Sequence, residues 1–294
     1  MTVQPGHVDS GRRLAVLGLA AAGVGGSRAA AARRVIRALV ESWPPYLYPG
    51  EGRAVRGLDA ELLEAICRRA GYELSWIRAP IERRKRRYQE LLSDQFDVIF
   101  SATPAARNLE DVMYTQSYRR EIMMVAAPVI HDSTLELVHG FNDVLKRRVR
   151  LLCVDAGGLG KEFEAFRQPL ENAGLLVRYP TSRQGVEMLR AGRAALILGD
   201  ALDLQEQARR IGFPLVRQPY GYNEEPVSLM LSRKRLNEAD LLRINQSISE
   251  LEQRGVLGAI RRRYSSDRNE TPRQAGAASG ASRGSRPMDF RPSR

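Results

Sequence analysis

The chain has 294 residues, of which 43% are hydrophobic and 27% are charged, as is usual for globular proteins. It contains no run of eighteen apolar residues, which argues against a transmembrane helix. Of the formal net charge of +12, residues 1–32 carry +2 and residues 265–294 carry +3, and the acids between them are interspersed with the bases. Because no nucleic-acid-reading motif accompanies this charge, we expect no nucleic-acid partner.

The first 32 residues have the layout of a secretory signal. Arg12 and Arg13 precede an apolar stretch of small residues from Leu14 to Gly26, and alanines follow at a position suited to signal cleavage. The paired arginines resemble a twin-arginine signal, and the general secretory route stays open beside it. A frayed alanine-rich helix is the structural alternative. We expect an exported, periplasmic protein from which residues 1–32 are removed.

The first half of the folded part alternates strand and helix patterns. A strand is expected over 35–42, and a helix over 58–71 that Gly71 ends. Then follow a strand over 72–79, a basic helix over 81–93, and strands over 96–102 and 121–129.

The second half continues the alternation. The expected elements are a helix over 139–148, a strand over 149–156, a glycine loop at 157–160 with a helix after it, a strand over 174–181, a helix over 182–192, and strands over 194–201 and 226–233. A long helix over 236–255 follows, with Asn237 as its N-cap and Gly255 as its end, and residues 256–264 close the fold. This order predicts α/β architecture.

The segment after the fold, residues 265–294, is rich in Ser, Gly, Pro, Arg and Ala, with Met288 and Phe290 as its large apolar residues. Such a segment buries too little surface to offset its ordering entropy, so we expect a disordered tail. An interaction arm is the alternative. Cys67 and Cys153 lie in apolar patterns and are expected to be buried thiols. With only three histidines, we expect no metal site and no cofactor.

Several motifs together resemble the family 3 extracellular solute-binding proteins. Pro44-Pro45-Tyr46 and Gly57-Leu58-Asp59 are similar to the opening of that family, although Leu stands where the family has an aromatic residue. FDVIFSATPAAR resembles the strand that ends in Ser and Thr with an Arg after it, in a shortened form. YTQSYRREIMMVAAP, GGLG and AGRAALILGDALDL resemble the crossover, the glycine loop and the Asp-bearing strand. The resemblance covers about residues 35–264.

This resemblance implies a two-lobed periplasmic-binding-protein-like fold of type II, in which each lobe is a mixed sheet flanked by helices and a hinge lies between. We expect residues 33–125 and 230–264 to form lobe 1 and residues 126–229 to form lobe 2. It implies a monomer that captures an amino-acid-like ligand without chemistry and delivers it to the permease of an ABC importer.

The resemblance also suggests ligand-binding residues. Arg107 would hold a ligand carboxylate, because a guanidinium matches it in bidentate geometry, and Asp200 would hold an ammonium. The remaining candidates are Ser101 and Thr103 at a strand end, Gly157 and Gly158 before a helix, and the aromatic walls Trp43, Tyr46 and Tyr118.

Each candidate has an ordinary structural role as its alternative. Arg107 would cap the following segment, Ser101 and Thr103 would shape the turn before Pro104, and Asp200 would cap the next helix. The aromatic residues would pack in the core or hinge. We expect Asp203, one turn beyond Asp200, to face solvent. Arg83 belongs to a solvated helix face or to the cleft.

Two other functions compete with transport. One is a ligand-sensing envelope protein on the same fold. The other is a dehydratase-like enzyme, since some relatives of the family are dehydratases. Acid–base catalysis requires a positioned proton carrier, and Asp200 and Glu121 are the candidates. No histidine lies in a motif that would serve, so binding without catalysis is the prediction.

Overall fold

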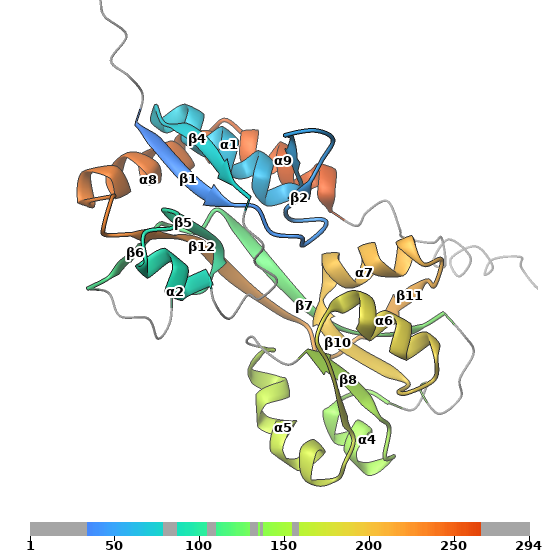
Figure 1. Ribbon diagram of the computed structural model, residues 1–294. Coiled ribbons are helices and arrows are strands. Elements are labelled where there is room, and N and C mark those ends of the chain that lie inside the picture. The colour runs from blue at the N-terminus through green and yellow to red at the C-terminus, as the bar shows by residue number, and fades with distance from the viewer. Residues whose placement is uncertain are drawn as a thin grey trace, which may run out of the picture. The chain divides into compact units, whose positions relative to one another are not determined.

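The computed structural model describes residues 34–78, 87–104, 110–129, 135, 138–154 and 159–265, which belong to one compact unit that begins at Arg34. Strands and helices alternate along it (Figure 1). The strands are β1 Val35–Leu39, β2 Tyr48–Pro49, β3 Val55–Arg56, β4 Glu73–Ile77, β5 Val98–Ala102, β6 Val112–Tyr114, β7 Arg119–Pro128, β8 Leu151–Val154, β9 Leu176–Tyr179, β10 Leu196–Asp200, β11 Leu215–Arg217 and β12 Asn223–Ser232. The helices are α1 Leu58–Ala70, α2 Arg87–Leu92, α4 Phe141–Lys146, α5 Lys161–Asn172, α6 Ser182–Arg190, α7 Ala201–Arg210, α8 Glu238–Gln253 and α9 Val256–Tyr264.

A mixed sheet runs through both lobes in the order β4-β1-β5-β12-β7-β10-β8-β9, with β6 paired to β12 and β11 paired to β7. The first lobe holds the parallel strands β4, β1 and β5, and the second lobe holds the parallel strands β10, β8 and β9. This is the predicted two-lobed α/β fold. Parallel strands have their carboxyl ends at the same edge of the sheet, so side chains at these ends lie close together.

The first lobe packs helices on both faces of its strands (Figure 1). One core joins α1, α8 and α9 to the sheet, and a smaller one lies under Leu91 of α2. Helix α1 forms because Leu62, Leu63 and Ile66 recur at helical spacing and are almost fully buried. Gly71 ends it in the left-handed region at φ 82°, as predicted.

The second lobe also buries both faces of its strands. On β7, Val125 and Ala127 face the core under α4 and α5, whereas Met124 and Ala126 face the core under α6 and α7. A strand buried on both sides reads as a continuous apolar run, which explains why these strands were visible in the sequence. Cys67 and Cys153 are buried free thiols in different cores, as expected.

Two long strands connect the lobes. Residues 223–227 of β12 pair with residues 119–123 of β7, and beyond that point β12 pairs with β5 while β7 pairs with β10. Each strand therefore belongs to both lobes, and the predicted lobe boundaries at 125/126 and 229/230 fall inside them. Both strands begin earlier than predicted, because their first residues are polar and carry no apolar pattern.

One helix has no counterpart among the predicted elements. None of them covers residues 202–215, although the alternative role of Asp200 as a helix cap implied a helix after it, and α7 occupies Ala201–Arg210 directly after β10. The predicted strand 194–201 ends one residue earlier, at Asp200, whose side chain caps α7. The predicted helix 81–93 is described from Arg87 onward as α2, and its earlier residues, with Ile81 and Arg83, lie outside the described part. Residues 1–33 and 266–294, where the signal and the tail are predicted, also lie outside it.

Candidate functional site

The first lobe contributes a loop of aromatic residues that follows β1. Trp43 and Tyr46 are both buried, and their ring centroids lie 4.5 Å apart. The peptide bond between Pro44 and Pro45 is cis. Gly57 lies against this loop at φ 121°, and a Cβ there would stand 2.3 Å from the carbonyl oxygen of Tyr46. Glycine is therefore required where α1 begins, and α1 begins directly behind the aromatic loop.

A buried ion pair lies beside Tyr46. Asp59, in the first turn of α1, accepts from Arg119 Nε at 2.7 Å and from Arg119 Nη2 at 3.0 Å, and both side chains are at most 1% exposed. The guanidinium carbon of Arg119 lies 4.3 Å from the centre of the Tyr46 ring. Burial acts to lower the pKa of Arg119 and is the largest single effect, but the charge of Asp59, Tyr118 and Tyr46, and the hydrogen bond to Asp59, together outweigh it and hold that pKa well above the ordinary value. Arg119 therefore keeps its positive charge.

Tyr118 and Ser101 complete this network. The Tyr118 hydroxyl donates to Asp59 Oδ1 at 2.8 Å and accepts from the backbone N–H of Ser101 at 3.0 Å. Ser101 has a φ of 55°, and its hydroxyl accepts from Arg119 Nη2. Ser101 thus lies at the carboxyl end of β5, as predicted, whereas its neighbour Thr103 is exposed. Tyr118 is 1% exposed and packs in the first-lobe core.

The second lobe contributes Asp200 at the end of β10. Its carboxylate caps α7 by accepting from the N–H of Asp203 at 2.8 Å, and it also accepts from the hydroxyl of Tyr46 at 2.8 Å and 2.9 Å. The second bond joins the two lobes directly. Burial, followed by the charge of Glu121, raises the pKa of Asp200 to about 7. Asp200 is therefore a buried carboxylate that is close to protonation at neutral pH.

Asp203 does not face solvent, so that expectation was wrong. It is 6% exposed and accepts from Trp43 Nε1 at 2.9 Å, from the Ser182 hydroxyl at 2.6 Å and from Gln207 Nε2 at 3.0 Å. The reason is that α7 begins at Ala201, so the side chain of Asp203 in its first turn points inward against the aromatic loop. Leu202 of the same turn packs against the first-lobe core. Trp43 and Tyr46 thus each bond an aspartate of the second lobe.

Arg119, the central cation of this cluster, is not among the residues predicted from the sequence. Asp59 was predicted only as part of the Gly57-Leu58-Asp59 motif. The available signal was an arginine at the start of a long apolar strand, where a charge is costly unless it is paired. Glu121, named as an acid candidate, is half-buried and raises the pKa values of both Asp200 and Tyr46.

Several predicted residues lie outside the described part of the chain: Arg107, Gly157 and Gly158. Gly160 of the same glycine loop is described. It precedes α5 at φ 93°, and a Cβ there would lie 2.7 Å from Cβ of Asn223 on β12. This glycine therefore lets the start of α5 approach the strands that connect the lobes. Within the described residues, no three His, Cys, Asp or Glu side chains are arranged to hold a metal ion.

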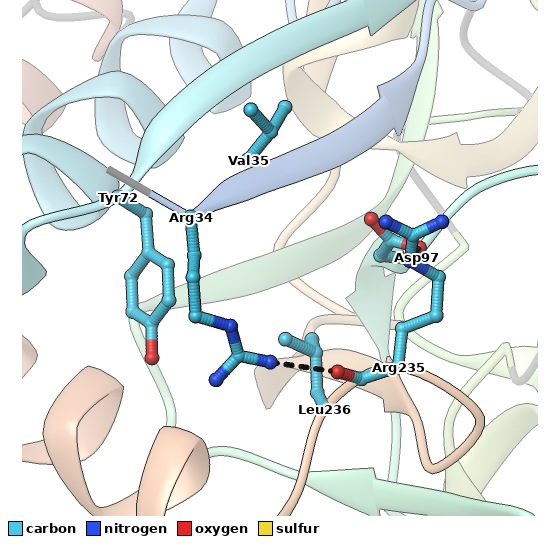
Figure 2. Close-up of a pocket in the computed structure, with 6 residues that line it drawn as sticks. All are labelled: Arg34, Val35, Tyr72, Asp97, Arg235 and Leu236. Carbon is cyan, nitrogen blue, oxygen red and sulfur yellow. Dashed lines mark hydrogen bonds and ion pairs between the residues drawn. The ribbon is translucent and has the colours of Figure 1, made fainter. Parts of the chain in front are cut away.

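A pocket of ≈ 100 Å³ lies elsewhere, at the edge of the first lobe where β1, β4 and β5 begin (Figure 2). Its lining residues are Arg34, Val35, Tyr72, Asp97, Arg235 and Leu236. Arg34 donates to the carbonyl oxygen of Arg235 at 2.9 Å, and Arg37 holds Asp97. The polar groups here satisfy one another, and the carboxyl ends of the strands lie at the other edge. We therefore place the candidate site at the Tyr46–Asp200 contact.

The cluster as a whole combines one compensated ion pair with carboxylates from both lobes. Asp59 is neutralised by Arg119, and Asp200 and Asp203 are held by neutral donors on the aromatic loop. Such an arrangement can receive a cationic group at Asp200 if Tyr46 releases it. No described helix is both long and apolar enough to cross a membrane.

Solved structures with this fold include proteins of different roles, all below 20% identity. A histidine kinase sensor domain with similarity to periplasmic binding proteins matches with a TM-score of 0.61 and 18% identity over 79% of this chain and 96% of its own. The substrate-binding protein of an amino acid ABC transporter matches at 0.57 and 17%, over 78% and 98%. The ancestral amino acid-binding protein AncCDT-1, a precursor of cyclohexadienyl dehydratase, matches at 0.60 and 14%, over 78% and 94%.

These likenesses establish the fold, which is that of type II periplasmic binding proteins. None of the curated proteins matches the chain. The sequence profile of the bacterial extracellular solute-binding proteins, family 3, matches residues 35–267, which span the whole described fold. The chain is a member of this family of extracellular solute-binding proteins.

Proposed function

We propose that this protein binds a small polar, amino-acid-like ligand between its lobes in the periplasm and delivers it to the permease of an ABC importer. The observation that carries the proposal is the buried carboxylate of Asp200, which the second lobe presents to the aromatic loop of the first. Family membership supports ligand capture. The substrate-binding protein of an amino acid ABC transporter, with the same fold, supports the class of ligand and the delivery step.

Binding would proceed by exchange at Asp200. In this structure the hydroxyl of Tyr46, an uncharged group, donates to the carboxylate of Asp200. A ligand ammonium would replace the hydroxyl as the donor and would add the attraction between opposite charges to the hydrogen bond. The new cation would also lower the pKa of Asp200 from about 7, so that the carboxylate is fully ionised in the complex. Arg107 remains the proposed partner of the ligand carboxylate.

The remaining candidates have secondary places in this proposal. Trp43 and Tyr46 would form one wall through their rings, and Ser101 would contribute its position beside Arg119 at the strand end. Gly157 and Gly158 would present backbone N–H groups before α5. Tyr118 and Thr103 would support the strand end rather than contact the ligand closely. The protein would act as a monomer, with residues 1–32 removed on export.

A thermal-shift screen of amino acids and related polar solutes tests the proposal. At about 100 times the dissociation constant, a ligand that binds only the folded state adds about 2.7 kcal/mol of stability. We expect one such solute to raise the melting temperature. Asp200→Asn and Arg107→Ala should each abolish the rise, and Asp94→Asn, an exposed carboxylate of the first lobe, should keep it. A confirmed ligand whose binding survives both changes would contradict the site.

A second candidate function is acid–base catalysis on the same fold. It is favoured by one observation, the pKa of Asp200 of about 7, because a general acid or base works best near the operating pH. AncCDT-1, which has the same fold, is a precursor of a dehydratase. Incubating the confirmed ligand with the protein distinguishes the two functions. Recovery of unchanged ligand supports binding, and its loss with wild type but not with Asp200→Asn supports catalysis.

A further inference from the structure

The edge of the second lobe where β8 and β10 begin gathers positively charged side chains. The two strands are parallel with Leu151 opposite Leu196, and the carbonyl oxygen of Arg150 accepts from the N–H of Ala195 at 3.2 Å. The segments that precede both strands therefore lie side by side. Helices α4 and α6 end in these segments. The cations they carry are Lys146, Arg147, Arg148, Arg150, Arg190 and Arg193, which we call the basic edge.

None of these six cations has a carboxylate partner among the described residues, and all six are exposed. Five other arginines of the same lobe are paired: Arg167 with Glu164, Arg178 with Glu171, Arg183 with Glu187, and Arg209 and Arg210 with Glu206. The negative ends of α4 and α6 account for one cation each, Lys146 and Arg190. Arg147 is the C-cap of α4, and Arg148, Arg150 and Arg193 lie beyond the helix ends, so helix stability does not explain these three.

The first lobe provides an internal comparison. Its corresponding edge, where β1, β4 and β5 begin, also carries arginines and borders the pocket of Figure 2. There the arginines have acidic partners: Arg34 with Asp240, Arg37 with Asp94 and Asp97, Arg233 with Glu238, and Arg235 with Asp97. A general bias toward arginine would leave both edges alike. Of these two edges, only that of the second lobe carries a set of arginines without carboxylate partners among the described residues.

Two half-exposed valines lie next to the basic edge. Val129 follows the end of β7, which runs antiparallel to β10 and so ends where β10 begins. Its N–H donates to the carbonyl oxygen of Pro214, just before β11, and Val216 of β11 pairs opposite Ala127. Val129 is 50% exposed and Val216 is 47% exposed. Apolar side chains beside long basic ones suit the boundary between headgroups and acyl chains.

We propose that the basic edge docks the protein on a membrane surface that contains anionic phospholipid. Guanidinium groups match phosphate oxygens in bidentate geometry, and a dispersed set of exposed cations fits a dispersed set of headgroups. An acidic protein partner is the other class of polyanion. A specific protein interface needs an apolar contact core, and two separate valines do not supply one. This inference does not depend on the ligand site, which lies at the carboxyl ends of the same strands.

Vesicle binding of the full chain tests the proposal. Wild type should sediment with vesicles of phosphatidylcholine and phosphatidylglycerol at low salt, should bind less at high salt, and should not bind pure phosphatidylcholine. The fourfold variant Arg147→Gln, Arg148→Gln, Arg150→Gln and Arg193→Gln should bind at least about tenfold more weakly, since each lost cation contributes near an anionic surface. The matched control changes four exposed arginines of the first lobe: Arg53→Gln, Arg68→Gln, Arg254→Gln and Arg262→Gln. This control has the same net charge as the variant of the basic edge, and it should bind as wild type does.

Three results would overturn the proposal. These are no binding of wild type to the anionic vesicles, an equal loss in both fourfold variants, and binding to soluble polyglutamate without binding to vesicles, which would assign the edge to an acidic protein. If the fourfold variant fails to fold, Arg147→Glu and Arg193→Glu as single changes carry the test. The thermal shift by ligand, measured on the same variants, should be unchanged, so a failure here is separable from a failure of the ligand proposal.

Discussion

At the scale of single residues, the site depends on how each buried charge is compensated. Asp59 and Arg119 neutralise each other and organise Tyr118 and Ser101 around them. Among the described residues, Asp200 has only neutral hydrogen-bond donors, Tyr46 and the N–H of Asp203, and it lies near the charge of Glu121. The charged groups of the first lobe are therefore preorganised, whereas the second lobe presents the carboxylate of Asp200, which a cation can bind.

Removing one partner of the buried ion pair should be strongly destabilising. In Arg119→Met the charge of Asp59 stays buried without compensation, which costs about 3–5 kcal/mol in other proteins. Urea unfolding should show this loss in the free energy of unfolding. The control is Arg183→Ala, which breaks an exposed pair with Glu187 on α6 and should cost at most about 0.5 kcal/mol. Similar effects of the two changes would show that the Asp59 pair is not buried in solution.

The raised pKa of Asp200 predicts the direction of a pH effect. Its ordinary value is 3.8 and its folded value is about 7, so between these values the folded state binds more protons than the unfolded state. The free energy of unfolding contributed by this group therefore falls as pH rises from about 4 to about 7. Urea unfolding across this range should show that fall in wild type and a smaller one in Asp200→Asn. An unchanged slope in the variant would exclude Asp200 as the titrating group.

At the scale of elements, the ends of helices decide where the functional side chains point. Helix α7 begins at Ala201 because Asp200 caps it, and this start turns Asp203 toward Trp43. Helix α1 begins behind the aromatic loop because Gly57 permits the close approach. The start of helix α8 is also set by its cap, although α8 contributes no side chain to the candidate site. Its predicted cap, Asn237, is confirmed: the Asn237 side-chain oxygen accepts from the N–H of Asp240, and the N–H of Asn237 donates to the Asp240 carboxylate.

The cap of α8 gives a test at this scale. Asn237→Ala removes the bond to the N–H of Asp240 and should lower the free energy of unfolding by about 1 kcal/mol. The control is Leu242→Ala on the same helix, where the side chain is 68% exposed and the change should fall within about 0.5 kcal/mol. Chemical denaturation of both variants measures the difference. Equal stability of the two variants would mean that the capping box contributes nothing.

At the scale of the whole molecule, β7 and β12 hold the two lobes in one sheet, while the direct lobe-to-lobe bonds are made by Trp43 and Tyr46. Helix α9 closes the first lobe by burying Leu257 and Ile260 against α1 and α8. Tyr264 at its end donates to Glu61 at 2.5 Å. The described fold ends with α9, and we expect the residues after it to add no stability.

Truncation tests this statement. Deleting residues 266–294 should leave the melting temperature nearly unchanged, because the segment has few apolar residues to anchor it. Deleting residues 256–294 also removes Leu257 and Ile260 and should lower the melting temperature strongly. Differential scanning calorimetry of both truncated proteins provides the measurement. A large decrease in the shorter truncation would show that Met288 and Phe290 dock on the body.

The sequence by itself determined the α/β class, most of the strands and helices, the helix ends at Gly71 and Asn237, and the resemblance to the family. These features are local, because the period of apolar residues reports which face of an element is buried. The family profile then confirmed the resemblance over residues 35–267.

Only the tertiary structure decided which charges meet. Arg119 reaches Asp59 across 60 residues, and Tyr46 reaches Asp200 across 154. The tertiary structure also decides that Asp203 points inward and that the cations of the basic edge have no carboxylate partner among the described residues. The physical reason is that compensation of a charge is a property of a pair, and the partner is fixed by how strands from distant parts of the chain align. Periodicity shows that a residue is buried or exposed, but it does not show what lies opposite.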